Sequence, residues 1–351
     1  MNELLDVWEK TLRISFSPPR GVLVVIVILF VYLLVLFPFA YLFAYFDRKL
    51  TADLQARVGP NRAGFRGVLQ VFADLVKLFQ KDPAFFSSGF EKENIWFHIY
   101  IMLLFTGVVF LPLGSLTLLI NTDMSALLPF CAAFVLAFCT LLFSLSQGEV
   151  QSSFGGLRVA VHVLSGAFPA LVALQAACLY AGSFRWSVIS ESQGVFPQSW
   201  AAFTSPFLFI SFCVFIVGGL VMWSLSPEEG GFSVSSKLSG KKFFIFRLGR
   251  FYGLFLWSVI AVVLYLGAWN MPASLYDGLK NSQEYLLILF IELGVLLAKT
   301  LFLMFVVTGI VRVNPKIRVD QATDLSWKIL SPLSLVSLIG TVLWSGWSYI
   351  R

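Results

Sequence analysis

The chain has 351 residues, of which 58% are hydrophobic and only 13% are charged. A soluble domain is typically about a quarter charged, so the composition excludes an ordinary soluble protein. The net charge of +6 does not indicate a nucleic-acid partner, because the basic residues are spread over short segments between apolar runs.

Eight apolar runs are long enough, or nearly long enough, to cross a bilayer as helices of about 20 residues each. They cover residues 21–46, 97–120, 124–147, 159–183, 206–225, 251–271, 286–311 and 329–349. The sequence therefore predicts an all-α polytopic membrane protein, with residues 1–351 forming a single membrane domain. We interpret residues 1–20 as an N-terminal surface segment that lies on the membrane. A disordered leader is the alternative.

The basic residues are divided unevenly between the two sides of the predicted bundle. Four loops on one side contain 18 of the 25 Lys and Arg residues, namely 47–96, 148–158, 226–250 and 312–328. Because Lys and Arg are retained on the cytoplasmic side, we place these loops in the cytoplasm and both termini outside it. A bacterial cytoplasmic (inner) membrane is the expected location.

The cysteines give no sign of a cofactor. All four lie in apolar runs and no two form a C-x-x-C pair: Cys131, Cys139, Cys178 and Cys213. Iron–sulfur clusters and zinc sites need closely spaced thiolate or imidazole ligands, and the only two histidines are far apart in the chain. We therefore expect no metal and no redox cofactor on this chain, and interpret the cysteines as packing residues.

The loop after the first apolar run carries more organised charge than any other. Gly59-Pro60-Asn61 indicates a turn. Over residues 66–81, apolar side chains recur at spacings of three and four, which predicts an amphipathic helix in the membrane interface. This helix is either anchored only by lipid or docks a soluble partner. The residues that would make the docking contacts are Gln55, Pro60, Asn61, Arg62, Arg66, Gln70, Asp74, Lys77 and Lys81.

Three cytoplasmic loops carry motifs. The first reads D-R-K from Asp47 and Q-A-R-V-G-P-N-R-A-G-F-R-G-V-L-Q from Gln55; later loops read G-G-L-R, ending at Arg158, and P-K-I-R-V-D-Q over 315–321. These runs resemble the signatures of the NuoH family, which supplies a membrane subunit of bacterial NADH–quinone oxidoreductase (respiratory complex I). The family normally has E-R-K, G-A-L-R and P-R-x-R-x-D-Q at these places. The resemblance covers nearly the whole chain.

The resemblance implies a membrane subunit of a proton-translocating NADH–quinone oxidoreductase. Such a subunit forms the entrance of the quinone chamber and the docking site for the peripheral redox arm, and is not catalytic alone. Quinone is then the substrate, while flavin and iron–sulfur clusters belong to partner subunits, and antiporter-like membrane subunits are further partners. The alternatives are the equivalent subunit of a membrane-bound hydrogenase-type or other ferredoxin-linked complex, a poorly coupling paralogue, and a free-standing transporter.

Ionisable residues in the spans and at their cytoplasmic ends are the candidates for the quinone chamber and the proton path. Charge inside a membrane is costly and faces a cavity or another charge. The candidates are Asp47, Arg48, Arg57, Arg158, Glu228, Glu229, Glu292, Lys299, Arg318 and Asp320.

The chain departs from the family where the family carries carboxylates. Ala167 stands at the glutamate of the family's S-Y-E, Arg250 stands where the family has glutamate, and the strongly acidic loop between them keeps only two carboxylates. These losses predict a weakened or rerouted proton path. Glu292 and Lys299, which lie on one helix face, either compensate for the losses or form a structural ion pair.

Overall fold

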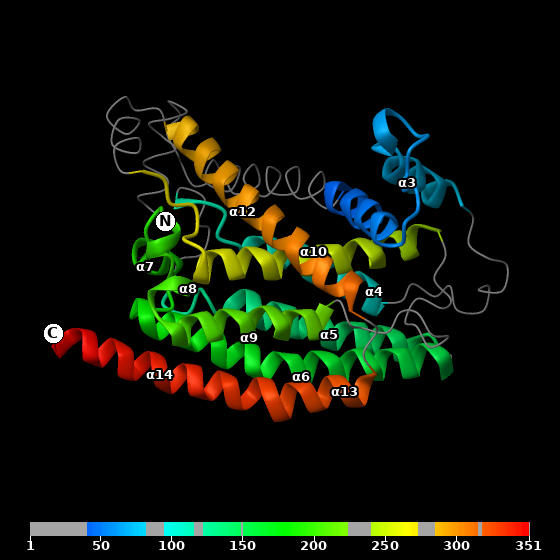
Figure 1. Ribbon diagram of the computed structural model, residues 1–351. Helices are drawn as coiled ribbons and strands as arrows, with labels where there is room; N and C mark the ends of the chain where they lie inside the picture. Colours follow the sequence, from blue (N-terminus) through cyan, green and yellow to red (C-terminus); the bar gives the residue numbers. More distant parts are fainter. Residues whose placement is uncertain are drawn as a thin grey trace, which may run out of the picture.

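The computed structural model describes residues 41–81, 95–115, 122–148, 150–223, 240–272, 285–314 and 318–350 (Figure 1). Within these ranges every regular element is a helix. The predicted surface segment 1–20 and the candidates Glu228 and Glu229 lie outside the described residues, as does most of the first predicted span. Its last part is described as a helix over residues 41–54.

Four described helices are long and apolar enough to cross a bilayer. They are α5 (Leu128–Ser146), α6 (Val150–Ala181), α12 (Tyr285–Val313) and a continuous helix made of α13 (Val319–Asp324), the π-helical turn η5 (Leu325–Leu330) and α14 (Ser331–Ile350). Shorter apolar helices lie within α9 (Pro206–Trp223) and α10 (Gly240–Tyr265). The all-α membrane class is confirmed, and the count of eight spans stays a prediction.

The first part of the second predicted span, 97–120, is helical. Helix α4 (Ile95–Val109) ends eleven residues before the predicted boundary. Residues 111–114 continue as non-helical backbone, with Leu111 and Leu113 each 1% exposed. Apolar composition thus predicted the burial of this segment correctly, but burial does not distinguish a helix from an extended chain whose polar groups find other partners.

Helix α6 is central to the packing, because it contacts α5, α9 and α14 along its length (Figure 1). Its contact with α9 is especially close at two glycines. A Cβ atom on Gly166 would lie 2.7 Å from the carbonyl oxygen of Gly218. Small residues allow such close approach in membranes, where van der Waals packing holds helices together.

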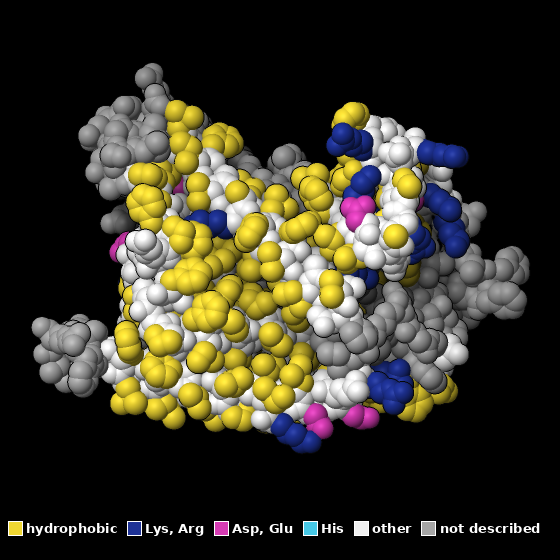
Figure 2. All heavy atoms as spheres, viewed as in Figure 1, with side chains coloured by type: hydrophobic (Ala, Val, Ile, Leu, Met, Phe, Trp, Pro, Cys, Tyr) yellow, Lys and Arg dark blue, Asp and Glu magenta, His cyan; other side chains and the backbone are white. Residues whose placement is uncertain are grey.

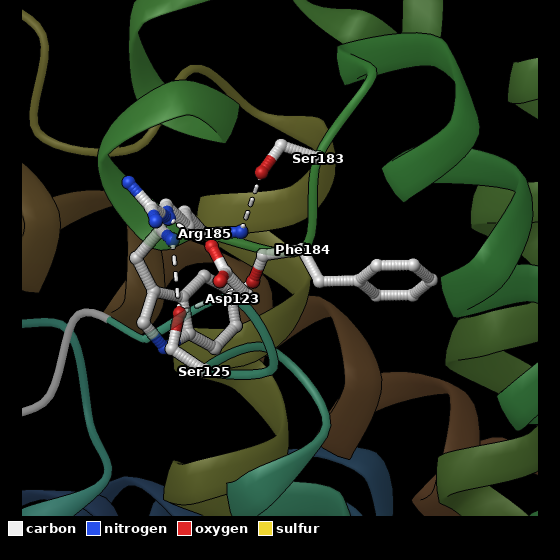
Figure 3. A network of polar contacts seen from close by, with 6 residues as sticks. Asp123, Ser125, Ser183, Phe184 and Arg185 are labelled. Carbon is white, nitrogen blue, oxygen red and sulfur yellow. Dashed lines mark hydrogen bonds and ion pairs between the residues drawn. The ribbon is translucent and has the colours of Figure 1, made fainter.

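A polar network closes one end of the bundle, where the turn before α5 meets the link from α6 to α7 (Trp186–Glu191) (Figure 3). The buried Ser125 hydroxyl donates to the carbonyl oxygen of Phe184 at 3.1 Å and accepts from the N–H of Trp186 at 3.1 Å. Arg185 forms an ion pair with Asp123. Since that ion pair is exposed and contributes little, the Ser125 hydroxyl is the stronger tie.

The outer surface of the bundle is apolar over a wide area (Figure 2). Phe302 on α12 is 70% exposed and Leu343 on α14 is 69% exposed. Soluble monomers rarely expose apolar patches of this extent, whereas a bilayer solvates them. On the face that Figure 2 shows, most Lys and Arg side chains lie in two places. One group surrounds α3 (Gln70–Gln80) at the upper right, and the other lies along the lower right edge.

Candidate functional site

The first loop folds back onto the helix over residues 41–54, and two glycines make this possible. Gly64 and Gly67 have φ of +73° and +81°, in the left-handed region that favours glycine. A Cβ atom on Gly67 would lie 2.1 Å from the carbonyl oxygen of Pro60, so no other residue fits. The Tyr45 hydroxyl donates to the carbonyl oxygen of Arg66 at 2.9 Å. The glycine-rich motif is therefore a structural turn that fixes α3 beside the membrane helix.

Asp47 forms a bidentate ion pair with Arg312 at the last turn of α12. Arg312 Nε and Nη2 lie 2.9 and 2.7 Å from the two carboxylate oxygens of Asp47. Asp47 is only 8% exposed, and two parallel charge-assisted hydrogen bonds are the strongest geometry that an Arg–carboxylate pair adopts. The pair joins two helices that are 265 positions apart in the chain.

Sequence reasoning missed Arg312 as a site residue and counted it only toward the charge of its loop. A usable signal was present. Asp47 and Arg312 were both expected at the cytoplasmic ends of apolar runs, and a charge at such an end commonly pairs with an opposite charge on a neighbouring helix. What the sequence could not supply was the adjacency of those two helices.

Arg48, the next residue, contacts α3, whereas Asp47 contacts α12. Its guanidinium forms an ion pair with Asp74, and Gln70 Nε2 donates to the other oxygen of Asp74 at 3.1 Å. The predicted docking residues Gln70 and Asp74 are therefore half-buried and engaged within the chain. One helical turn thus holds α12 through Asp47 and α3 through Arg48.

An apolar groove of about 250 Å³ lies between the helix over residues 41–54 and α12. Each helix contributes one face, with residues spaced three and four apart as on a helix surface. The lining residues are Phe43, Phe46, Asp47, Leu50, Leu301, Phe302, Phe305 and Thr308. Six of the eight are hydrophobic. The polar end is marked by Thr308 and Asp47, and Arg312 follows one turn beyond Thr308.

The remaining described candidates among the loop residues do not line this groove. Arg57 is exposed and donates to Gln55. Arg158 is half-buried on α6. Arg318 is exposed at the start of α13, where its backbone N–H donates to Gln321 Oε1 at 3.1 Å, and Asp320 in the next turn is exposed.

The expected ion pair between Glu292 and Lys299 is wrong, because each side chain has its own partners. The Ser115 N–H and hydroxyl donate to Glu292 at 2.8 and 2.6 Å. Lys299 Nζ donates to the carbonyl oxygens of Leu266, Gly267 and Ala268. Their spacing placed them correctly on one helix face. They do not contact each other, because Ser115 binds Glu292 and the carbonyl oxygens after α10 bind Lys299.

The rest of the predicted docking surface is accessible. Gln55, Asn61, Arg62, Arg66, Lys77 and Lys81 are exposed, and Pro60 is half-buried. Two apolar side chains that sequence reasoning did not single out are almost fully exposed on the same loop, Val58 at 83% and Phe65 at 81%. Their place beside a cationic cluster is typical of interface cores with a polar rim.

Within the described ranges, no three His, Cys, Asp or Glu side chains lie together so as to hold a metal ion. The surface of the groove is almost entirely hydrocarbon, and the Asp47–Arg312 ion pair lies beside it. This combination suits a molecule with an apolar body and a polar head.

Comparison with known proteins identifies the family. The NADH dehydrogenase family model matches residues 25–342. The chain belongs to this family. Its relatives include an NADH-quinone oxidoreductase subunit of Anaeromyxobacter dehalogenans, 30% identical over 86% of this chain and 76% of the relative. Another is an F(420)H(2) dehydrogenase subunit of Methanosarcina mazei, 28% identical over 84% of this chain and 86% of the relative. The family resemblance of the loop motifs is confirmed.

Breaking the Asp47–Arg312 pair should destabilise the chain more than removing both charges. Asp47→Asn leaves a partly buried guanidinium without its carboxylate, so we expect a loss of about 1–3 kcal/mol. Asp47→Asn combined with Arg312→Gln should recover part of this loss, because no charge is left unpaired. The measurement is the thermal midpoint of the purified assembly. Additive losses in the double variant would contradict a direct pair.

Proposed function

We propose that this chain is the membrane subunit of a complex-I-type quinone oxidoreductase and that its groove is the entrance for quinone. The observation that carries the proposal is the groove between residues 41–54 and α12, with aromatic walls and an ion pair at its end. A quinone tail gains free energy by burying apolar area, and its head group needs hydrogen-bond donors, which Arg312 would supply beside Asp47.

The same assembly needs a docking site for the subunits that carry electrons. We propose that residues 55–81 form it, as the polar surface on which a peripheral arm rests. Val58, Phe65 and the exposed cations on this loop support the proposal. Flavin and iron–sulfur clusters would then reside on the partner subunits, with antiporter-like subunits elsewhere in the membrane. The location would be a bacterial inner membrane, with both termini outside the cytoplasm.

A second candidate is the equivalent subunit of a complex with a different electron donor. The relative from the F(420)H(2) dehydrogenase supports it, because that protein matches a similar share of this chain. Identification of the soluble subunits that co-purify with the chain distinguishes the two. A nucleotide- and flavin-binding subunit for NADH supports the first, and a deazaflavin- or ferredoxin-linked subunit supports the second.

Narrowing the groove should slow quinone reduction selectively. Leu301→Trp places a larger side chain in the groove wall, so we expect the KM for a long-tailed quinone to rise about tenfold, equivalent to about 1.4 kcal/mol of binding. Electron transfer to ferricyanide, a water-soluble acceptor, should be unchanged. Phe290→Trp is the control on the same helix, because Phe290 is exposed outside the groove. Equal KM values in both variants would reject the groove as the entrance.

Reversing charge on the first loop should release the peripheral arm. Arg62→Glu together with Arg66→Glu places carboxylates where an acidic partner would dock, and like charges at an interface cost several kcal/mol. A native gel should show the membrane part without its soluble subunits. Lys328→Glu is the control and should leave the assembly intact. Lys328 is an exposed residue of η5 that pairs with Asp324 at the end of α13. An intact assembly in the double variant would show that docking uses other residues.

Weaker proton coupling is part of the proposal. The family's fourth-span carboxylate position is occupied by Ala167, which is 2% exposed and cannot carry a proton. We expect fewer protons per electron pair in sealed proteoliposomes than from a complex whose equivalent membrane subunit keeps all the carboxylates. An equal ratio would mean that other titratable groups carry the path.

A further inference from the structure

Lys299 lies in a cradle of backbone oxygens at the end of a neighbouring helix. Its Nζ is 2.9, 3.1 and 3.0 Å from the carbonyl oxygens of Leu266, Gly267 and Ala268. An ammonium group has three N–H donors and no acceptor, so three convergent carbonyls satisfy all of its donors. The Trp200 ring covers it, with its centroid 4.8 Å from Nζ.

The cradle is built by the way α10 ends. The carbonyls of residues 266–268 follow the last residue of α10, Tyr265, so the hydrogen bonds of that helix do not use them. After Tyr265 the backbone turns sharply, with φ of +74° at Gly267 and +41° at Ala268. Positive φ at an alanine is strained, and this one is fully buried. The turn therefore directs successive carbonyls toward one point at a local cost that the ammonium offsets.

Two further residues fix the walls of the cradle. Gln193 Oε1 accepts from the N–H of Gly267 at 2.8 Å, and its Nε2 donates to the carbonyl oxygens of Val263 and Leu264 at 2.9 and 3.1 Å. A Cβ atom on Gly267 would lie 2.6 Å from the Trp200 ring. The aromatic face can approach the cation only because residue 267 is glycine.

These contacts stabilise the ammonium group of Lys299, and no carboxylate among the described residues is one of them. Glu292, the acid on the same helix face, accepts hydrogen bonds from Ser115. Carbonyl oxygens and an aromatic face are the groups that bind ammonium and small monovalent cations. We infer that residues 266–268 and Trp200 form a cation site of this class, and that Lys299 occupies it as a tethered ligand that locks α12 to the end of α10.

The lock acts on the helix that carries the groove. Helix α12 crosses α10 (Figure 1), and its cytoplasmic half contributes Leu301, Thr308 and Arg312 to the candidate site. Lys299 is a positioning residue in this arrangement, because its three N–H donors are held by carbonyl oxygens at the end of the neighbouring helix.

The test is chemical rescue in the purified, assembled complex. Lys299→Ala empties the cradle, and we expect its thermal midpoint to fall by several degrees. Added n-propylammonium supplies the three missing carbons and the three N–H donors, and should restore at least half of the loss. n-Propanol matches the chain without the charge, and tetramethylammonium matches the charge without N–H donors; neither should restore it. The unaltered complex should not respond to n-propylammonium.

A wild-type midpoint for Lys299→Met, which keeps the length of the side chain without its charge, would overturn the inference. Equal rescue by n-propanol would also overturn it, because the site would then need only filling. If Lys299→Ala does not assemble, Trp200 gives the second test. Trp200→Phe keeps an aromatic face and should stay near the wild-type midpoint, whereas Trp200→Leu should lose several degrees. Equal midpoints for these two variants would reject a cation site at this position.

Discussion

The ion pair between Asp47 and Arg312 is the contact on which the candidate site depends. It joins the helix over residues 41–54 to the last turn of α12 across 265 positions of sequence. Because Arg48 follows directly and pairs with Asp74 on α3, a rotation of the helix over residues 41–54 would disturb both contacts together. The groove walls, the folded loop and the position of α3 are therefore mechanically coupled through one helical turn.

Glu292 and Lys299 on α12 share one feature, which is that each forms hydrogen bonds to a segment just beyond the end of another helix. Glu292 accepts from Ser115 where α4 has already ended, and Lys299 donates to carbonyls where α10 has ended. Free backbone groups in hydrocarbon cost several kcal/mol each, and so does an isolated charge. Placed together, each satisfies the other, so non-helical segments are tolerated at membrane depth.

Composition and spacing predicted the membrane class, the turn at Pro60 and the amphipathic helix that became α3, because these depend on local chemistry. They ended the first span at residue 46, whereas the helix continues through Asp47 to residue 54. The partners of the charges were beyond their reach. Arg312 was missed as a site residue, and the ion pair between Glu292 and Lys299 did not form. Helix periodicity predicts the face on which a residue lies, but it does not predict which neighbouring helix or chain segment packs against that face. The early end of α4 was missed for the same reason.

Relatives of this chain are named for complexes with different electron donors, and the proposed role of the groove accounts for this. The described residues near the groove are hydrophobic side chains, one hydroxyl and an ion pair, and such a surface distinguishes an apolar tail with a polar head from water-soluble molecules. Under the proposed function, the described residues of the groove include no group that distinguishes one electron donor from another. Relatives named for different donors could then share this type of subunit, with the donor set by the partner that we propose binds residues 55–81.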